Sequence, residues 1–211
     1  MGRRHAVSLA ARLWDENGDL AAAALGHPFV RGLGDGTLPQ ETFAGYVAQD
    51  TFFLESFARA YALALAHSPD RPTLDAFADL LGGVRGELGL HSSYATQLGI
   101  DLSAVEPSTA TLAYTDFLLA TAALDSIART CAAMTPCMRL YAHLGTSLAA
   151  RTDTGYVEWI TTYADPEFER LAVRLEDLLD LHAPDPEAVR PTYRRAMELE
   201  VSFFDATYRH A

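Results

Sequence analysis

The sequence predicts an all-α protein, a bundle of long helices around one shared core. Apolar residues recur every three to four positions through most of the 211 residues, and this spacing places them on one face of a helix. We find no segment in which apolar and polar residues alternate as they do in a half-buried strand. The stretches rich in turn residues are short, and long helices joined by short connections form a bundle.

The turn-rich stretches divide the chain into its expected helices. The richest of them runs from His27 to Pro39, and Pro39 followed by Gln40 suits the start of a helix. The expected helices cover about 8–25, 40–67, 73–98, 107–122, 126–150, 154–163, 166–181 and 186–209.

Two of these helices contain residues that disfavour helical structure. Helix 73–98 has four glycines between positions 82 and 89, and each costs about 1 kcal/mol relative to alanine in a helix interior. The last helix has two possible starts. One is Asp185-Pro186, an N-cap residue followed by a proline in the first turn, and the other is Pro191.

Length, charge and cysteine content narrow the class of protein. A chain of 211 residues suggests a single domain over 1–211, and we expect residues 1–7 to be a flexible tail. The net charge of −12 argues against nucleic acid and anionic membranes as partners. No apolar run has the length of a signal peptide or a membrane span, so we expect a cytoplasmic protein. Cys131 and Cys137 lie six residues apart, which suits neither a disulfide nor a cysteine-based zinc site.

Asp50 lies on the apolar stripe of helix 40–67, four residues after Tyr46 and three before Phe53. A carboxylate on a buried face needs a partner, because burying a bare charge is expensive. Two readings are open: a structural hydrogen bond, or a pocket carboxylate that holds a polar ligand.

The last helix repeats this arrangement. Glu200 shares one side with Tyr193, Met197 and Phe204, whereas Glu198 lies on the side that is rich in charged residues. A buried glutamate tends to have a raised pKa, which suits a general acid. The alternative is a buried structural ion pair or hydrogen bond.

Cys137 follows Thr135-Pro136 inside an otherwise helical stretch. Proline kinks or restarts a helix because it lacks a backbone donor. A restart at Thr135 would place Cys137 in a first helical turn, where the pKa of a thiol is lowered. Cys137 is then either a nucleophile, with Tyr141 on the same face, or a packed structural thiol, the reading that fits Cys131.

Four segments occur together in a specific order. They are the His27–Pro39 segment, Gln-Asp-Thr-Phe-Phe-Leu around Asp50, Thr-Pro-Cys-Met-Arg-Leu-Tyr around Cys137, and Glu-Val-Ser-Phe-Phe from Glu200. From about residue 9 to residue 210, the chain resembles the TenA (thiaminase II) family, in its cysteine-bearing branch.

The resemblance implies a heme-oxygenase-like all-α bundle, usually a homotetramer, that works without a metal or other cofactor. The implied activity is hydrolysis of 4-amino-5-aminomethyl-2-methylpyrimidine to the hydroxymethyl pyrimidine, a step of thiamin salvage; cleavage of thiamin is the related thiaminase II reaction. The resemblance makes Cys137 the nucleophile and Glu200 the general acid. It places the substrate against Asp50, Phe53, Tyr114, Tyr141, Tyr163 and Phe203.

The chain departs from the family pattern at two positions. Phe53 stands where many members have a tyrosine, so one hydroxyl is missing from the expected pocket. Arg139 stands where an apolar or aromatic residue is common, and we expect its side chain to point away from Cys137.

Two other functions are compatible with such a bundle. A di-iron oxidase would need several His, Asp and Glu ligands on facing helices. Here Glu87 and His91 are four residues apart and could form half a site, but one turn earlier stands Val84, which cannot be a ligand. The second alternative is a pyrimidine-binding or regulatory protein without catalysis, and the joint presence of Cys137 and Glu200 argues against it.

Overall fold

The computed structural model describes residues 7–209, and within this range its helices confirm the predicted all-α class. The helices are α1 (Leu9–Glu16), α2 (Gly18–Leu25), α3 (Pro28–Asp35), α4 (Gln40–Ala66), α5 (Arg71–Leu98), α6 (Thr109–Leu124), α7 (Ile127–Leu148), α8 (Val157–Tyr163), α9 (Pro166–His182) and α10 (Pro186–Arg209), with a 3-10 turn at Leu102–Ala104. Most of the expected tail, residues 1–6, lies outside the described residues.

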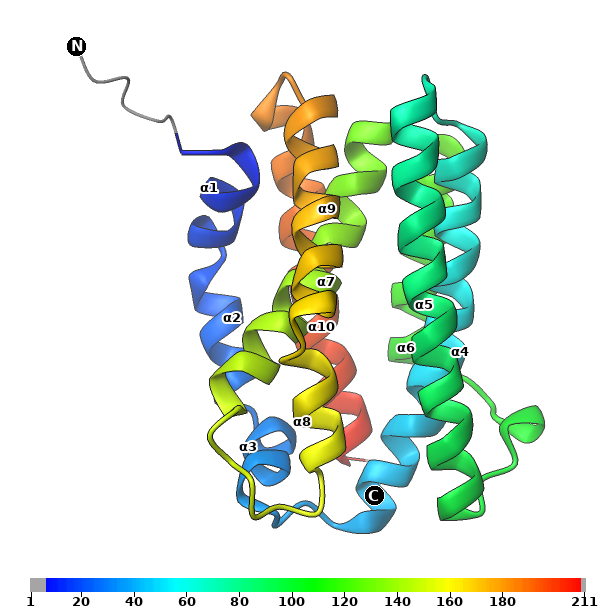
Figure 1. Cartoon of the computed structure of the whole chain (residues 1–211), viewed down its shortest axis with the longest axis vertical. Coiled ribbons are helices and arrows are strands. Elements are labelled where there is room, and N and C mark those ends of the chain that lie inside the picture. Colours follow the sequence, from blue (N-terminus) through cyan, green and yellow to red (C-terminus); the bar gives the residue numbers. More distant parts are fainter. Residues whose placement is uncertain (1–6, 210–211) are drawn as a thin grey trace.

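The long helices form two groups that face each other (Figure 1). Helix α4 packs against α5 and α6, and α7 packs against α9 and α10. Contacts of α6 with α7 and α10, and of α5 with α9, join the groups around one hydrophobic core. Helices α1, α2 and α3 cover the side of α9 and α10. The aromatic stripes of α4 and α10 therefore face each other inside the bundle.

The predicted first helix, 8–25, is in fact two helices. Helix α1 ends at Asn17, whose side chain donates a hydrogen bond to the carbonyl of Leu13 at 2.8 Å, and α2 begins at Gly18. Asparagine followed by glycine is a strong turn signal. The sequence prediction missed the break because the apolar spacing continues on both sides.

The prediction of a turn-rich segment from His27 to Pro39 was wrong for its first part, which forms α3. His27 caps this helix, since its Nδ1 accepts the backbone N–H of Phe29 at 3.1 Å, and Pro28 occupies the first turn. The helix ends at Gly36, whose φ of 70° suits glycine. Proline and glycine here mark a helix start and a helix end rather than a loop.

Helix α5 is continuous in spite of its glycines, because its packing against neighbouring helices outweighs the low helix propensity of glycine. An added Cβ at Gly83 would lie 2.5 Å from Cδ1 of Leu171 on α9, so this glycine permits a close approach of the two helices.

The last helix, α10, begins at Pro186. The side chain of Asp185 accepts the backbone N–H of Glu187 at 3.0 Å, which confirms the first of the two possible starts.

The predicted helix 126–150 is confirmed, and the restart that Pro136 left open does not occur. Helix α7 runs without interruption from Ile127 to Leu148, with Pro136 inside it. Thr135 is not an N-cap; its hydroxyl donates to the carbonyl of Cys131 at 2.7 Å. Every residue from 130 to 138 is buried, so contacts on all sides hold the helix together in spite of the missing donor.

Within the described residues, we find no helix with a stretch long and apolar enough to cross a membrane.

Candidate active site

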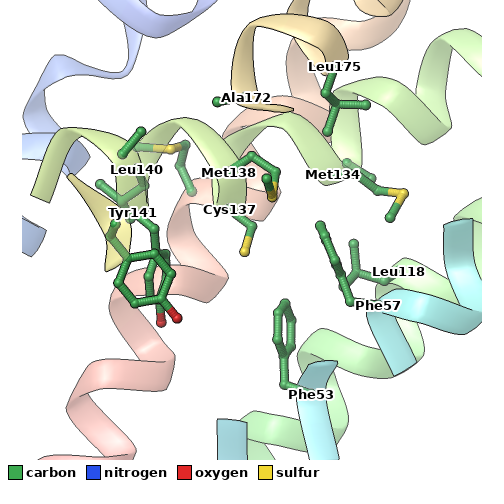
Figure 2. Packing of buried hydrophobic residues seen from close by; sticks show 14 of the residues in the cluster. Phe53, Phe57, Leu118, Met134, Cys137, Met138, Leu140, Tyr141, Ala172 and Leu175 are labelled. Carbon is green, nitrogen blue, oxygen red and sulfur yellow. The ribbon is translucent and has the colours of Figure 1, made fainter. Parts of the chain in front are cut away.

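The structure brings all the predicted site residues into one buried cluster between the two helix groups. Figure 2 shows the Cys137 side chain pointing from α7 toward the side of the core where Phe53, Phe57 and Tyr141 lie. Cys137 is the most exposed of the predicted site residues, at only 8%. The others are Asp50 and Phe53 on α4, Tyr114 on α6, Tyr141 on α7, Tyr163 on α8, and Glu200 and Phe203 on α10.

Aromatic rings form the walls of this cluster. On one side, the ring of Phe53 lies 4.8 Å from that of Tyr114 and 6.0 Å from that of Phe203, between ring centroids. On the other side, the rings of Tyr141 and Tyr163 are 4.8 Å apart. Flat walls of this kind suit a flat aromatic ligand.

Asp50 has two partners that hold it in place. The hydroxyl of Tyr46 donates to its Oδ2 at 2.8 Å, and Nε2 of His91 lies 2.7 Å from the same oxygen. Burial by itself would lower the pKa of His91, but the hydrogen bond and the charge of Asp50 outweigh burial and raise it. The contact is that of a buried ion pair, in which the charge of the imidazolium offsets the cost of burying the carboxylate.

Tyr46 connects this pair to the other rings. Its hydroxyl oxygen lies 3.4 Å from that of Tyr141 and accepts the indole N–H of Trp159 at 3.3 Å. Sequence reasoning placed Tyr46 on the buried stripe but not in the site. The signal was present, because a tyrosine one turn before a buried aspartate is within hydrogen-bond reach.

Glu200 is in contact with the cysteine. The hydroxyl of Tyr114 donates to Oε1 of Glu200 at 2.6 Å, and the Cys137 thiol is hydrogen-bonded to the same carboxyl group. Burial raises the pKa of Glu200 to about 8, although both hydrogen bonds oppose the shift. The prediction of a buried glutamate with a raised pKa agrees with this geometry, as does that of a solvated Glu198, which pairs with Arg195 at 3.5 Å.

The thiol of Cys137 is not activated in the way that the sequence suggested. Because α7 is continuous, Cys137 lies mid-helix, away from the positive end of the helix. Burial raises its pKa well above the ordinary value, and the nearby carboxylates Glu200, Glu87 and Asp50 raise it further. In the resting site Cys137 is therefore a neutral thiol, and it needs a base to become a nucleophile.

Glu87 and His91 do not form half of a metal site. The imidazole of His91 reaches Asp50, with its Nδ1 3.0 Å from the backbone carbonyl oxygen of Glu87. The carboxylate of Glu87 instead accepts the hydroxyl of Tyr163 at 2.5 Å. Within residues 7–209, no group of three or more His, Cys, Asp or Glu side chains is arranged to hold a metal ion. Sequence reasoning noticed this pair only as an incomplete metal site and did not predict its place beside Asp50 and Tyr163.

Arg139 points away from the cysteine, as predicted. Its guanidinium donates to Glu176 at 2.7 and 2.8 Å and to Glu169 at 2.8 and 2.9 Å. Both partners lie on α9, so Arg139 joins α7 to α9 and takes no part in the pocket.

The fold and the site together define a helical-bundle protein with a thiol–carboxyl pair in a buried aromatic cluster. The chain belongs to the TENA/THI-4/PQQC family, whose sequence model matches residues 14–210.

Known proteins support this membership. The chain is 34% identical to the aminopyrimidine aminohydrolase of Halalkalibacterium halodurans, over 96% of each chain. It is 31% identical to the aminopyrimidine aminohydrolase of Bacillus subtilis, over 87% of this chain and 82% of that protein.

Solved structures support the fold. The TenA homologue of Pyrococcus horikoshii superposes with a TM-score of 0.91 at 26% identity, over 97% of this chain and 100% of that one. Heme oxygenase-1 of Synechocystis, at 17% identity, has a TM-score of 0.58 over 97% of this chain and 94% of that one, which bears on the fold alone. The predicted heme-oxygenase-like bundle is thereby confirmed.

Proposed function

We propose that this chain hydrolyses 4-amino-5-aminomethyl-2-methylpyrimidine to the hydroxymethyl pyrimidine and ammonia, by addition of Cys137 to the pyrimidine ring. The class of enzyme, an aminopyrimidine aminohydrolase of thiamin salvage, is the one that the curated relatives carry by name. The observation that carries the mechanism is the contact between the Cys137 thiol and the Glu200 carboxyl inside an aromatic pocket.

Asp50 is suited to bind the aminopyrimidine edge. Its hydrogen bonds with Tyr46 and His91 both involve Oδ2, so these partners fix the carboxylate while Oδ1 remains available to a ligand. Oδ1 can accept a hydrogen bond from the amino group of an aminopyrimidine or from a protonated ring nitrogen. The rings of Phe53 and Tyr114 offer a flat wall for the base.

Glu200 is suited to move the protons of the reaction. Ionised Glu200 takes the thiol proton, the sulfur bonds to a ring carbon, and a ring nitrogen receives the electron pair and a proton from the His91–Asp50 pair. The electrons then return and break the C–N bond of the exocyclic methylene. A neutral amine takes the proton of Glu200 as it leaves, and the water that adds to the methylene returns a proton to Glu200. An ammonium leaves as neutral ammonia, which takes the proton of the water itself. Finally the C–S bond breaks, the ring nitrogen returns its proton to the His91–Asp50 pair, and Glu200 reprotonates the sulfur.

The test is ammonia release from the aminomethyl pyrimidine, measured beside cleavage of thiamin. We expect turnover by the wild type and none by Cys137→Ser, whereas Cys131→Ser, the matched buried cysteine on the same helix, should keep turnover. Failure of the wild type to turn over either substrate would overturn the proposal. A binding or regulatory protein would bind the pyrimidine equally well with serine at position 137 and would release no ammonia.

We also propose that the chain assembles as a homotetramer. Helix α6 contains one charged residue, Asp116, and exposes Ala113, Ala120 and Leu124 along one face. Leu124 is 86% exposed in the single chain. An apolar face of this kind is typical of a surface that another copy covers. The single domain over 1–211 and the cytoplasmic location stay predictions.

A further inference from the structure

Glu87 lies between the aromatic cluster of the site and an open cavity. The cavity has a volume of about 590 Å³ and lies between α5, α7 and the junction of α8 and α9. Glu87 and Met138 line it, and Met138 is the neighbour of Cys137 on α7. The Glu87 carboxylate also contacts Tyr163, which is 1% exposed and belongs to the pocket. One side chain therefore touches both the buried site and the cavity.

The other carboxylates of the cavity wall have partners of their own on or near the surface. Asp79 pairs with Arg174 at 3.3 Å, and Glu167 pairs with Arg170 at 2.6 Å. Asp165 accepts the backbone N–H at the start of α9 at 2.7 Å. These three acidic side chains take part in ion pairs or in a helix cap, whereas the Glu87 carboxylate contacts Tyr163 of the site.

The pocket beside Glu87 is rich in acidic groups. The Glu87 side chain is half-buried, and the burial of its carboxyl group raises its pKa to about 7, so that at neutral pH the ionised form is well populated. The titratable groups that face it are Asp50 and Tyr61 on α4, His91 on α5, Cys137 on α7 and Tyr163 on α8, with Arg170 of α9 at the cavity rim. His91 is engaged with Asp50, so a cationic ligand would relieve the mutual repulsion of the remaining carboxylates.

We propose that Glu87 recognises a positively charged leaving group, an alkylammonium or an azolium on the exocyclic methylene of the pyrimidine, where that group extends from the pocket into the cavity. The inference rests on the proposed function and specifies which substrates the site prefers. Glu200 is less suited than Glu87 to bind this leaving group, because Glu200 is 1% exposed, contacts Tyr114 and Cys137, and does not line the cavity.

The role predicted for Glu87 is in binding rather than in the chemical step. When the C–N bond breaks, its electron pair goes to the nitrogen, so an azolium loses its positive charge as it leaves. A carboxylate beside it stabilises the bound substrate more than the transition state. Loss of the charge at position 87 should therefore raise KM for cationic substrates without lowering kcat.

The experiment compares Glu87→Gln with the wild type on three pyrimidines that differ in the leaving group. Thiamin and the aminomethyl pyrimidine present a cation at neutral pH, and the N-formyl aminomethyl pyrimidine presents a neutral amide. We expect KM to rise about 10-fold for the two cationic substrates, in line with the loss of one charge-assisted hydrogen bond, and to stay within about 2-fold for the neutral one. Glutamine keeps an oxygen that can accept the Tyr163 hydroxyl, so the pocket geometry is preserved.

Glu55→Gln is the control for net charge, because Glu55 is an exposed residue on the opposite side of α4 from Asp50, paired with Arg59. Equal loss on all three pyrimidines would overturn the inference, because it would mean that Glu87 only supports Tyr163. Unchanged KM for the cationic substrates would overturn it as well. If the wild type turns over none of them, the proposed function fails separately, and calorimetric titration of the same three ligands into both proteins still decides the role of Glu87.

Discussion

At the scale of single residues, the protonation of Cys137 depends on Glu200. The thiol is buried and its pKa is raised, so the site at rest contains little thiolate. Glu200 has a pKa of about 8 and is hydrogen-bonded to that thiol. The protonation of the two groups is coupled, and an apparent pKa measured by kinetics belongs to the pair rather than to either residue.

This coupling predicts a pH dependence with a definite sign. Glu200 can take the thiol proton only when it is ionised, and it is mostly protonated below its pKa of about 8. The value of kcat/KM should therefore rise with pH and level off above an apparent pKa near 8. Glu200→Gln should lower kcat by about 10²- to 10⁴-fold, the usual contribution of a general acid–base. Steady-state rates between pH 6 and 9.5 check both points, and a flat profile or near-normal turnover by the variant would contradict them.

At the scale of elements, the position of Tyr163 depends on a close contact between α7 and α8. Helix α8 is a short segment, Val157–Tyr163, too short to be stable without tertiary packing. Gly145 of α7 faces its end, where an added Cβ would lie 2.6 Å from the backbone nitrogen of Ala164 and would also meet the backbone of Tyr163. The absence of a side chain at position 145 therefore sets how near Tyr163 comes to Cys137.

We predict opposite effects for two glycine-to-alanine substitutions. Gly145→Ala should destabilise the protein by about 1–3 kcal/mol, because backbone atoms have to move, and it should also reduce turnover through Tyr163. Gly89→Ala on α5, where an added Cβ meets nothing within 4 Å, should stabilise the protein by about 0.5–1 kcal/mol. Urea unfolding of both variants measures the difference. A stable, fully active Gly145→Ala protein would show that α8 adjusts freely.

At the scale of the whole molecule, the two helix groups each supply part of the site. The Asp50–His91 pair comes from α4 and α5, whereas Glu200 comes from α10. The pair and Glu200 are brought together only when the two helix groups pack face to face. The outer side of α6 carries the apolar face that we assign to another copy of the chain.

The assembly predicts a clear effect of a charge on that face. Leu124→Asp should dissociate the tetramer, because it would bury an unpaired carboxylate in the interface, and it should leave the helical circular-dichroism spectrum unchanged. Leu181→Asp on α9, where the leucine is 66% exposed, is the control and should keep the assembly. Light scattering coupled to gel filtration measures both. A monomeric wild type, or equal dissociation by both variants, would contradict the assignment to α6.

The sequence by itself determined the helical class, most helix positions and the residues that gather in the site. Apolar spacing reports which face of a helix is buried, and it placed Asp50 and Glu200 on buried faces before any contact was known. Local chemistry also decided some boundaries, such as the cap at Asp185. The break at Asn17 and the helix that begins at Pro28 could have been predicted from the sequence, because the residues that cause them are adjacent in the chain.

Only the tertiary structure decided how the site residues are paired and protonated. Pro136 signals a helix restart in isolation, yet packing on all sides keeps α7 continuous and leaves Cys137 a buried thiol. His91 binds Asp50 across 41 positions of sequence, and Glu87 turns to Tyr163 rather than to a metal. The physical reason is range: helix propensity and capping act over a few residues, whereas burial, hydrogen bonding and pKa depend on neighbours that only the assembled bundle brings into contact.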